Sequence, residues 1–179
     1  MKQLRRPKKE STVRVLTVLL FVAFFTTTFT VGSEIEIPQE EQEILKNQIK
    51  EKLETARDNS DSSFIFLNNV FIGLMMVIPF GIGIVIGLAS AFVTGLTVGG
   101  FDLEIPAYLL LYTTPFGFIE LIAYSLAMTS SLYLTKSILK KNKQVIKKEL
   151  KFYGATVGIV VALIFFGGVI ENHMLGIGV

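Results

Sequence analysis

The feature that most constrains this chain is a run of 40 consecutive residues, from Ser62 to Phe101, that contains no Asp, Glu, Lys or Arg. Only 18% of the 179 residues are charged, whereas about 25% is typical of soluble domains. A membrane-spanning helix needs about 20 predominantly apolar residues, so the run is long enough for more than one crossing. These observations predict an integral membrane protein of the all-α class.

The chain starts with a basic segment. Residues 1–14 carry six Lys and Arg residues against one acid, and an apolar run from Val15 to Val31 follows. Excess Lys and Arg stay on the cytoplasmic side of a membrane, which predicts a cytoplasmic N-terminus. The length of the run favours a retained anchor over residues 1–32, although the small pair Gly32-Ser33 also fits a cleaved signal peptide.

Residues 33–62 are acidic, with nine acids and four bases. Apolar residues recur there at helical spacing, at Ile44, Leu45, Ile49 and Leu53. Pro38 suits the first turn of a helix, so we expect an external amphipathic helix over about Pro38–Ala56. Such a helix serves either as a spacer that rests on the membrane or the bundle, or as a docking helix for a partner.

A second basic block, residues 136–151, contains seven lysines and one acid. We expect it to form a cytoplasmic loop at the anionic leaflet, and we expect no nucleic-acid partner. If 33–62 is external, the chain between the two segments must cross the membrane an odd number of times. Residues 64–100 are too long for one helix and are interrupted at Pro79–Gly83, which predicts two spans over about 64–79 and 82–100.

The remaining apolar residues complete the predicted topology. A fourth span starts near Phe116, after a surface or re-entrant segment over 106–114, and a fifth span over Phe152–Ile170 returns to the outside. The prediction is a polytopic helical bundle of about five transmembrane helices in the cell membrane, with a cytoplasmic N-terminus and an external C-terminus. The chain then divides into 1–32, the external helix within 33–62, and a membrane bundle over 63–179.

Small residues recur every four positions in three of the predicted spans. Small residues at this spacing let helices pack closely in lipid. The predicted packing positions are Gly83, Gly87, Ala91, Gly95 and Gly99 in the third span, Ala123, Ala127 and Ser131 in the fourth with Gly117 near its start, and Gly154, Gly158 and Ala162 in the fifth. We expect packing within the chain, and a homodimer or partner interface is the alternative.

Five polar residues interrupt the apolar runs: Asn68, Asn69, Thr94, Glu120 and Glu171. The predicted topology places all five at a similar level, toward the external face. Ionisable residues in spans are costly, and no Lys or Arg lies in any predicted span after the first. Three roles fit these residues: structural hydrogen bonds between helices, contact with a partner or substrate, or an ion or proton path.

The sequence contains no recognisable catalytic set. It has no Cys and one His, and it contains no HExxH, GxSxG or Walker motif. Glu171 and His173 are possible metal ligands, but two ligands are too few for a site. We therefore expect no metal, no cofactor and no enzymatic activity.

Four segments of the sequence contain motifs whose order and spacing match those of a known protein family. They are the paired Asn68-Asn69 at the start of a span, Thr94-Gly95 with Gly99, Pro115-Phe116-Gly117 with Glu120 and Ala123, and Ile170-Glu171. Together they resemble the stage II sporulation protein M family over about residues 64–172. The resemblance implies that the family's motif positions are Asn68, Asn69, Gly95, Gly99, Pro115, Gly117, Glu120 and Glu171.

Two residues depart from that family's pattern. Thr94 stands where the family usually has Asn, and Phe116 stands where it usually has His. A role that depends on that His, such as proton transfer or metal contact, is therefore not expected here.

The resemblance implies a role in a protein complex. In endospore-forming bacteria the family member anchors a complex with cell-wall-degrading partners, and related chains occur in organisms that make no spores. We expect a non-catalytic membrane scaffold or subunit that contacts other membrane or extracytoplasmic subunits, or a second copy of itself, through its outer polar residues. The alternative is a small transporter or channel-like protein that uses Glu120 and Glu171 as a cation or proton relay.

Overall fold

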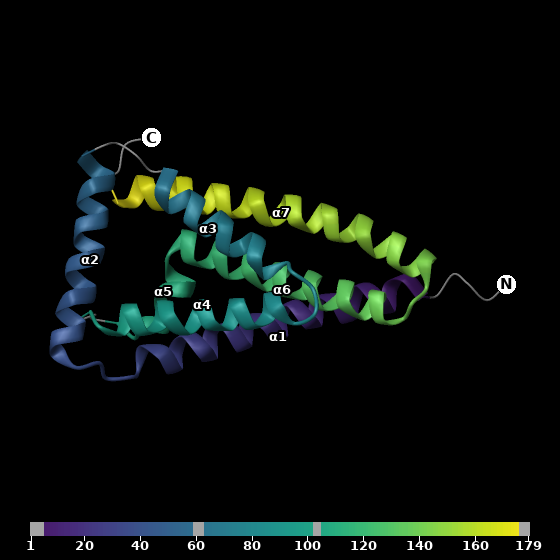
Figure 1. Cartoon of the computed structure of the whole chain (residues 1–179), viewed down its shortest axis with the longest axis horizontal. Helices are drawn as coiled ribbons and strands as arrows, with labels where there is room; N and C mark the ends of the chain where they lie inside the picture. The colour runs from purple at the N-terminus through teal and green to yellow at the C-terminus, as the bar shows by residue number, and fades with distance from the viewer. Residues whose placement is uncertain (1–5, 59–62, 102–104, 176–179) are drawn as a thin grey trace.

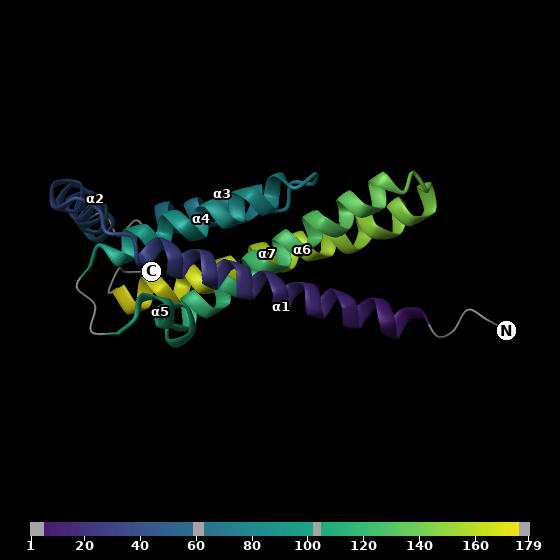
Figure 2. The same ribbon diagram turned by 90° about the horizontal axis from the view of Figure 1, so that it is seen from below.

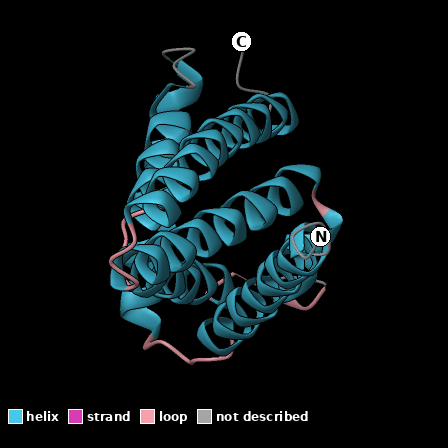
Figure 3. Cartoon of the chain, turned by 90° about the vertical axis from the view of Figure 1, so that its right-hand side faces the viewer, coloured by secondary structure: helices cyan, strands magenta, loops and turns pink. Residues whose placement is uncertain are grey.

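The computed structural model describes residues 6–58, 63–101 and 105–175. The described residues form seven helices, and no strand occurs among them (Figure 3). In chain order the helices are α1 (Arg6–Ser33), α2 (Gln39–Asp58), α3 (Ser63–Met76), α4 (Ile82–Gly99), α5 (Ala107–Thr113), α6 (Pro115–Leu139) and α7 (Lys143–Leu175). The prediction of an all-α chain is confirmed.

Four helices are long and apolar enough to cross a membrane. The stretches are Glu10–Ser33 in α1, Ile82–Gly99 in α4, Pro115–Leu139 in α6 and Lys143–Met174 in α7. Helix α3 contains a shorter apolar stretch, Leu67–Met76. The whole of α3 has 14 residues and is about 21 Å long, whereas the hydrocarbon core of a membrane is about 30 Å thick. The chain is thus a polytopic helical membrane protein, and the second of the five predicted spans is shorter than expected.

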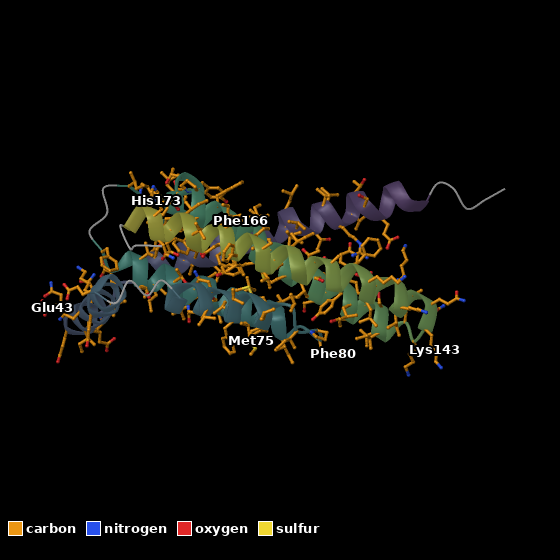
Figure 4. The ribbon with its side chains drawn as sticks, turned by 90° about the horizontal axis from the view of Figure 1, so that it is seen from above. Glu43, Met75, Phe80, Lys143, Phe166 and His173 are labelled. Atoms are coloured by element: carbon orange, nitrogen blue, oxygen red, sulfur yellow. The ribbon has the colours of Figure 1, made fainter. Side chains whose placement is uncertain are left out.

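The long helices run in roughly the same direction, and α2 lies across one end of them (Figure 1). Toward the other end α1 diverges from α6 and α7 (Figure 2). Helix α1 and the α6–α7 turn extend beyond the α3–α4 turn at the other end (Figure 2). Lys143 lies at that end and Glu43 of α2 at the opposite one (Figure 4). We call these the lysine end and the acidic end. The start of α1 and the second basic block therefore lie together, at the end remote from the acidic helix.

Most predicted elements occur close to their expected positions, but residues 136–151 do not form a loop. Helix α6 continues to Leu139 and α7 begins at Lys143, so only three residues connect them. The side-chain oxygen of Asn142 accepts hydrogen bonds from the backbone N–H groups of Gln144 (3.0 Å) and Val145 (3.3 Å). This cap starts α7 immediately after the turn, and the lysines therefore lie on two helices.

The predicted small face of α4 packs inside the bundle. Four of its residues are buried: Gly83, Gly87, Ala91 and Gly95. A β-carbon at Gly95 would collide with the backbone carbonyl oxygen of Phe29 in α1, and one at Gly99 would collide with that of Ser33. Helix α1 therefore packs as part of the same bundle as residues 63–175.

The core lies around α6, against which α1, α3, α4 and α7 pack. Its large buried side chains include Phe25, Phe29, Met76, Leu121, Met128 and Ile164. Ala123 and Ala127 of α6 are fully buried, as the sequence predicts. Gly117 is also buried, with the backbone of α5 directly against it. The small residues of α6 thus allow α5 and the long helices to approach it closely.

The predicted small face of α7 does not pack against the part of the chain that the structure describes. Gly154, Gly158 and Ala162 are exposed. A β-carbon at either glycine would have no neighbour within 4 Å in the described part of the chain. Helix α7 instead turns a different face to its neighbours, with Val160 and Ile164 fully buried.

The turn between α3 and α4, residues 77–81, is held by side chains of α6 and α7. The three hydrogen bonds run from the Phe80 N–H to Thr135 Oγ1 (2.6 Å), from the Ser131 hydroxyl to the Ile78 carbonyl (2.6 Å), and from the Tyr153 hydroxyl to the Val77 carbonyl (3.3 Å). Non-helical backbone at membrane depth requires partners of this kind, because lipid offers none. The tight reversal predicted at Pro79–Gly83 is thus made by local sequence and supported by later helices.

Candidate functional site

The start of α6 determines where Glu120 lies. Thr114 is extended, Pro115 occupies the first turn, and the helix then runs without interruption to Leu139. Proline suits a first helical turn because its missing N–H has no intrahelical partner there. Glu120 therefore projects from the acidic-end part of α6, one to two turns inside the bundle.

Two asparagines of α3 connect to that carboxylate. The side-chain amide of Asn69 donates to Glu120 Oε1 at 2.7 Å, and the Asn68 amide donates to Asn69 Oδ1 at 3.5 Å. Asn68 is exposed, whereas Asn69 and Glu120 are partly buried. The three residues form a chain of polar contacts that runs from the surface of α3 into the bundle.

Helix α7 supplies the other acid. A β-carbon at Gly167 would lie 3.6 Å from Glu120 Cγ, so the glycine lets α7 lie directly against the Glu120 side chain. Glu171 follows one helical turn later, and its carboxyl group interacts electrostatically with that of Glu120. The structure thus brings together four of the five predicted residues: Asn68, Asn69, Glu120 and Glu171.

Asn172 is the next residue after Glu171 along α7, and the sequence analysis did not single it out. It is 5% exposed, and its Oδ1 atom and Oε2 of Glu171 are both buried without a hydrogen-bond partner among the described residues. An amide next to an acid at the end of an apolar helix was the available signal. We call Asn68, Asn69, Glu120, Glu171 and Asn172 the outer polar cluster.

Thr94 does not belong to the cluster. It is exposed on α4, next to the buried Gly95 that packs against α1. Thr94 lies on a face of α4 that does not point toward the polar residues of α3, α6 and α7, so its depth alone does not bring it to them.

The chemistry of the outer polar cluster is dominated by hydrogen-bond acceptors. In the described residues no ion pair joins Glu120 or Glu171 to a Lys or Arg. Within the same residues, no group of three or more His, Cys, Asp or Glu side chains is arranged to hold a metal ion. The arrangement suits a ligand or partner that provides N–H groups or a positive charge.

Comparison with known proteins covers most of the chain. A family model described as stage II sporulation protein M matches residues 16–173. The match includes most of α1, and it therefore begins well before the motifs at 64–172 that carry the resemblance. No curated protein and no solved structure shows a significant match. With a family match that extends from α1 to α7, the chain belongs to the stage II sporulation protein M family.

Proposed function

We propose that this chain is a non-catalytic, multi-pass subunit of a protein complex in the cell membrane, and that the outer polar cluster receives a partner. The proposal depends on one observation: Glu171 Oε2 and Asn172 Oδ1 are buried acceptors without donors in the described chain. Each buried unsatisfied polar group costs about 1–3 kcal/mol. Glu171 as a whole is only half-buried, so a partner that donates to its carboxyl group offsets part of that cost.

The chemistry of the cluster defines the partner. Glu120 already accepts a hydrogen bond from Asn69, whereas Glu171 Oε2 and Asn172 Oδ1 have no donor among the described residues. Polar side chains associate helices in lipid, and Asn, Gln, Lys and Arg are the donors that match a carboxylate. The partner is therefore a membrane or extracytoplasmic segment with such a donor, from another subunit or from a second copy of this chain.

The acidic helix lies at the same end of the molecule. Helix α2 crosses the acidic end of the bundle, and its described acids, including Glu40, Glu41 and Glu43, are exposed (Figure 1). A partner with a basic surface would meet α2 and the outer polar cluster from the same side. In this role α2 is a docking helix, which is the second of its two predicted uses.

Co-purification with matched variants tests the proposal. A tagged chain is extracted from its native membranes in mild detergent, and the bound proteins are quantified for wild type, Glu171→Gln, Asn172→Leu and, as a control at the exposed opposite end, Lys143→Gln. We expect a stoichiometric partner with wild type and Lys143→Gln, and its loss with both α7 variants while the chain remains monodisperse. A chain that carries no second protein and is monodisperse alone, or partner binding that survives both α7 variants, would contradict the proposal.

A specific observation also favours the alternative function, a cation or proton relay. Ser125 and Thr129 follow Glu120 along α6, and their hydroxyl groups are buried without partners among the described residues. Together with the two carboxyl groups they extend the polar positions from the acidic end toward the lysine end. The relay predicts that wild type supports proton flux in liposomes and that Glu120→Gln abolishes it while Glu43→Gln does not. Absence of flux in wild type, or unchanged flux in Glu120→Gln, excludes this function.

A further inference from the structure

The lysine end contains a cavity that the outer polar cluster does not explain. It has a volume of about 330 Å³ and lies between α1, α6 and α7. This size falls within the range of small-molecule sites, roughly 300–1,000 Å³. One wall is apolar and is formed by Val15, Val18 and Leu126. Because Val15 is 56% exposed, this wall continues onto the lipid-facing surface of α1.

The rim of the cavity is held by an ion pair between distant parts of the chain. Arg14 Nη1 donates to Glu149 Oε1 at 2.9 Å, and its Nη2 donates to Oε2 of the same carboxylate. Glu149 is only 5% exposed, and the guanidinium lies over the ring of Tyr133, 4.3 Å from its centroid. A guanidinium has five N–H donors, so the bidentate pair does not use all of them, and Arg14, whose Nη2 also lies 3.5 Å from Glu10 Oε1, lines the cavity. Arg14 is therefore a fixed cation beside an apolar wall.

The second cation on the rim is loosely held. Lys148 Nζ lies 3.3 Å from Glu10 Oε2, and the two side chains are 63% and 48% exposed. An exposed pair of this kind contributes about 0–1 kcal/mol, so a ligand can replace either partner at little cost. The charges of Glu10, Arg14, Lys148 and Glu149 cancel. A ligand that separates Lys148 from Glu10 leaves one cation and one carboxylate of the protein without their partner. A complementary ligand therefore carries one negative and one positive group.

The inner wall of the cavity is polar as well as apolar. Ser130 and Thr129 line it together with Leu126, and both hydroxyl residues are almost completely buried. The cavity therefore offers charges at its rim, polar residues at its wall and an apolar wall open to lipid. A glycerol-linked phospholipid headgroup has the same sequence of chemical groups.

We propose that this cavity binds one membrane phospholipid with a primary ammonium headgroup, such as phosphatidylethanolamine. Its phosphate lies between Arg14 and Lys148, and its ammonium donates to Glu10. The glycerol group lies against the wall that contains Thr129 and Ser130, and an acyl chain follows Val15 and Val18. The site is at the opposite end of the bundle from the outer polar cluster and does not depend on the partner proposed there.

Native mass spectrometry of the full chain in detergent tests this site. Phosphatidylethanolamine, phosphatidylcholine and phosphatidylglycerol with identical acyl chains are added separately to delipidated protein. We expect a single retained phosphatidylethanolamine and about tenfold weaker binding of phosphatidylcholine, whose trimethylated nitrogen cannot donate to Glu10. Glu10→Gln should remove this preference between the two lipids.

The lysines provide a matched control. Lys148→Gln should weaken phosphatidylethanolamine binding several-fold, whereas Lys147→Gln, an exposed neighbour outside the cavity, should leave it unchanged. Equal binding of phosphatidylethanolamine and phosphatidylcholine to wild type would overturn the proposal. Tighter binding of phosphatidylglycerol, or equal effects of the two lysine variants, would overturn it as well, because either result indicates general attraction to the lysines.

Discussion

Gly95 brings the backbone of α4 into direct contact with the Phe29 carbonyl group of α1. We expect Gly95→Ala to separate the two helices and to reduce stability by about 1–3 kcal/mol, the usual cost of overpacking a core. Gly158→Ala is the matched control, because its β-carbon would meet no described atom within 4 Å. This second variant should gain about 0.5–1 kcal/mol, since alanine is the better helix former. Thermal unfolding in detergent measures both, and equal shifts would contradict the close contact at Gly95.

Ser131 is a second residue whose removal should be costly. Its hydroxyl donates to the Ile78 carbonyl, and the side chain is fully buried. Ser131→Ala removes this hydrogen bond and leaves the Ile78 carbonyl with the Gly83 N–H as its donor, so we expect a loss of about 0.5–1.5 kcal/mol in detergent unfolding. Thr97→Ala is the control, because the Thr97 hydroxyl donates only to the Val93 carbonyl one turn earlier on an exposed face. A loss of the same size in both variants would show that the turn does not depend on Ser131.

The outer polar cluster shows what residue patterns can and cannot predict. Asn69, Glu120 and Glu171 could be placed at one level because the topology sets depth along the helix axis. Depth does not give direction, since neighbouring residues on a helix point about 100° apart. Thr94 therefore has the predicted depth but lies on an exposed face, and Asn172 was missed although it is buried beside Glu171.

Among the elements, α1 packs as a permanent part of the bundle. Phe21, Phe25 and Phe29 are buried at 5%, 4% and 1% exposure, and removing α1 would expose all the surfaces they cover. We therefore expect the protein from native membranes to retain α1, as an anchor does and a cleaved signal peptide does not. Intact mass measurement of the purified protein checks this. A mass that corresponds to a chain starting after Ser33 would contradict the prediction.

Helix existence was easier to predict than helix contacts. Charge-free runs, Pro38 and the Pro79–Gly83 break anticipated α2, the α3–α4 turn and the start of α6 to within a few residues. The loop expected at 136–151 was wrong because a single Asn142 cap restarts a helix within three residues. Small residues are equally spaced on α4 and on α7. The small face of α4 packs against α1, whereas that of α7 packs against no described residue, so spacing alone does not identify a contact.

For the whole molecule, the charge distribution predicts orientation in the membrane. The lysine end and the acidic end lie at opposite ends of the bundle (Figure 4). Excess lysines stay in the cytoplasm, so we expect Lys143 inside and Glu43 outside. The chain has no Cys, so Lys143→Cys and Glu43→Cys each provide a single labelling site. An impermeant maleimide should label Glu43→Cys in intact cells and label Lys143→Cys only after permeabilisation. Labelling of Lys143→Cys in intact cells would reverse the topology.

Contacts between the two ends of the sequence were not predictable from pattern. Arg14 and Glu149 are 135 residues apart, and no periodicity connects them. The sequence places both in basic segments that face the same side, and this restricts the partners that each can meet. Only the packing of α1 against α6 and α7 selects this pair and creates the cavity beside it.

The α3–α4 turn has a consequence for how the protein is made. Its three supporting side chains lie 53, 55 and 76 residues further along the chain than the backbone groups they bind. During synthesis the hairpin therefore emerges from the ribosome well before Ser131, Thr135 and Tyr153 exist to satisfy it. We therefore expect the turn to reach its final packing only once α6 and α7 are in place, so that the middle of this chain settles in the bilayer after its last helix has arrived.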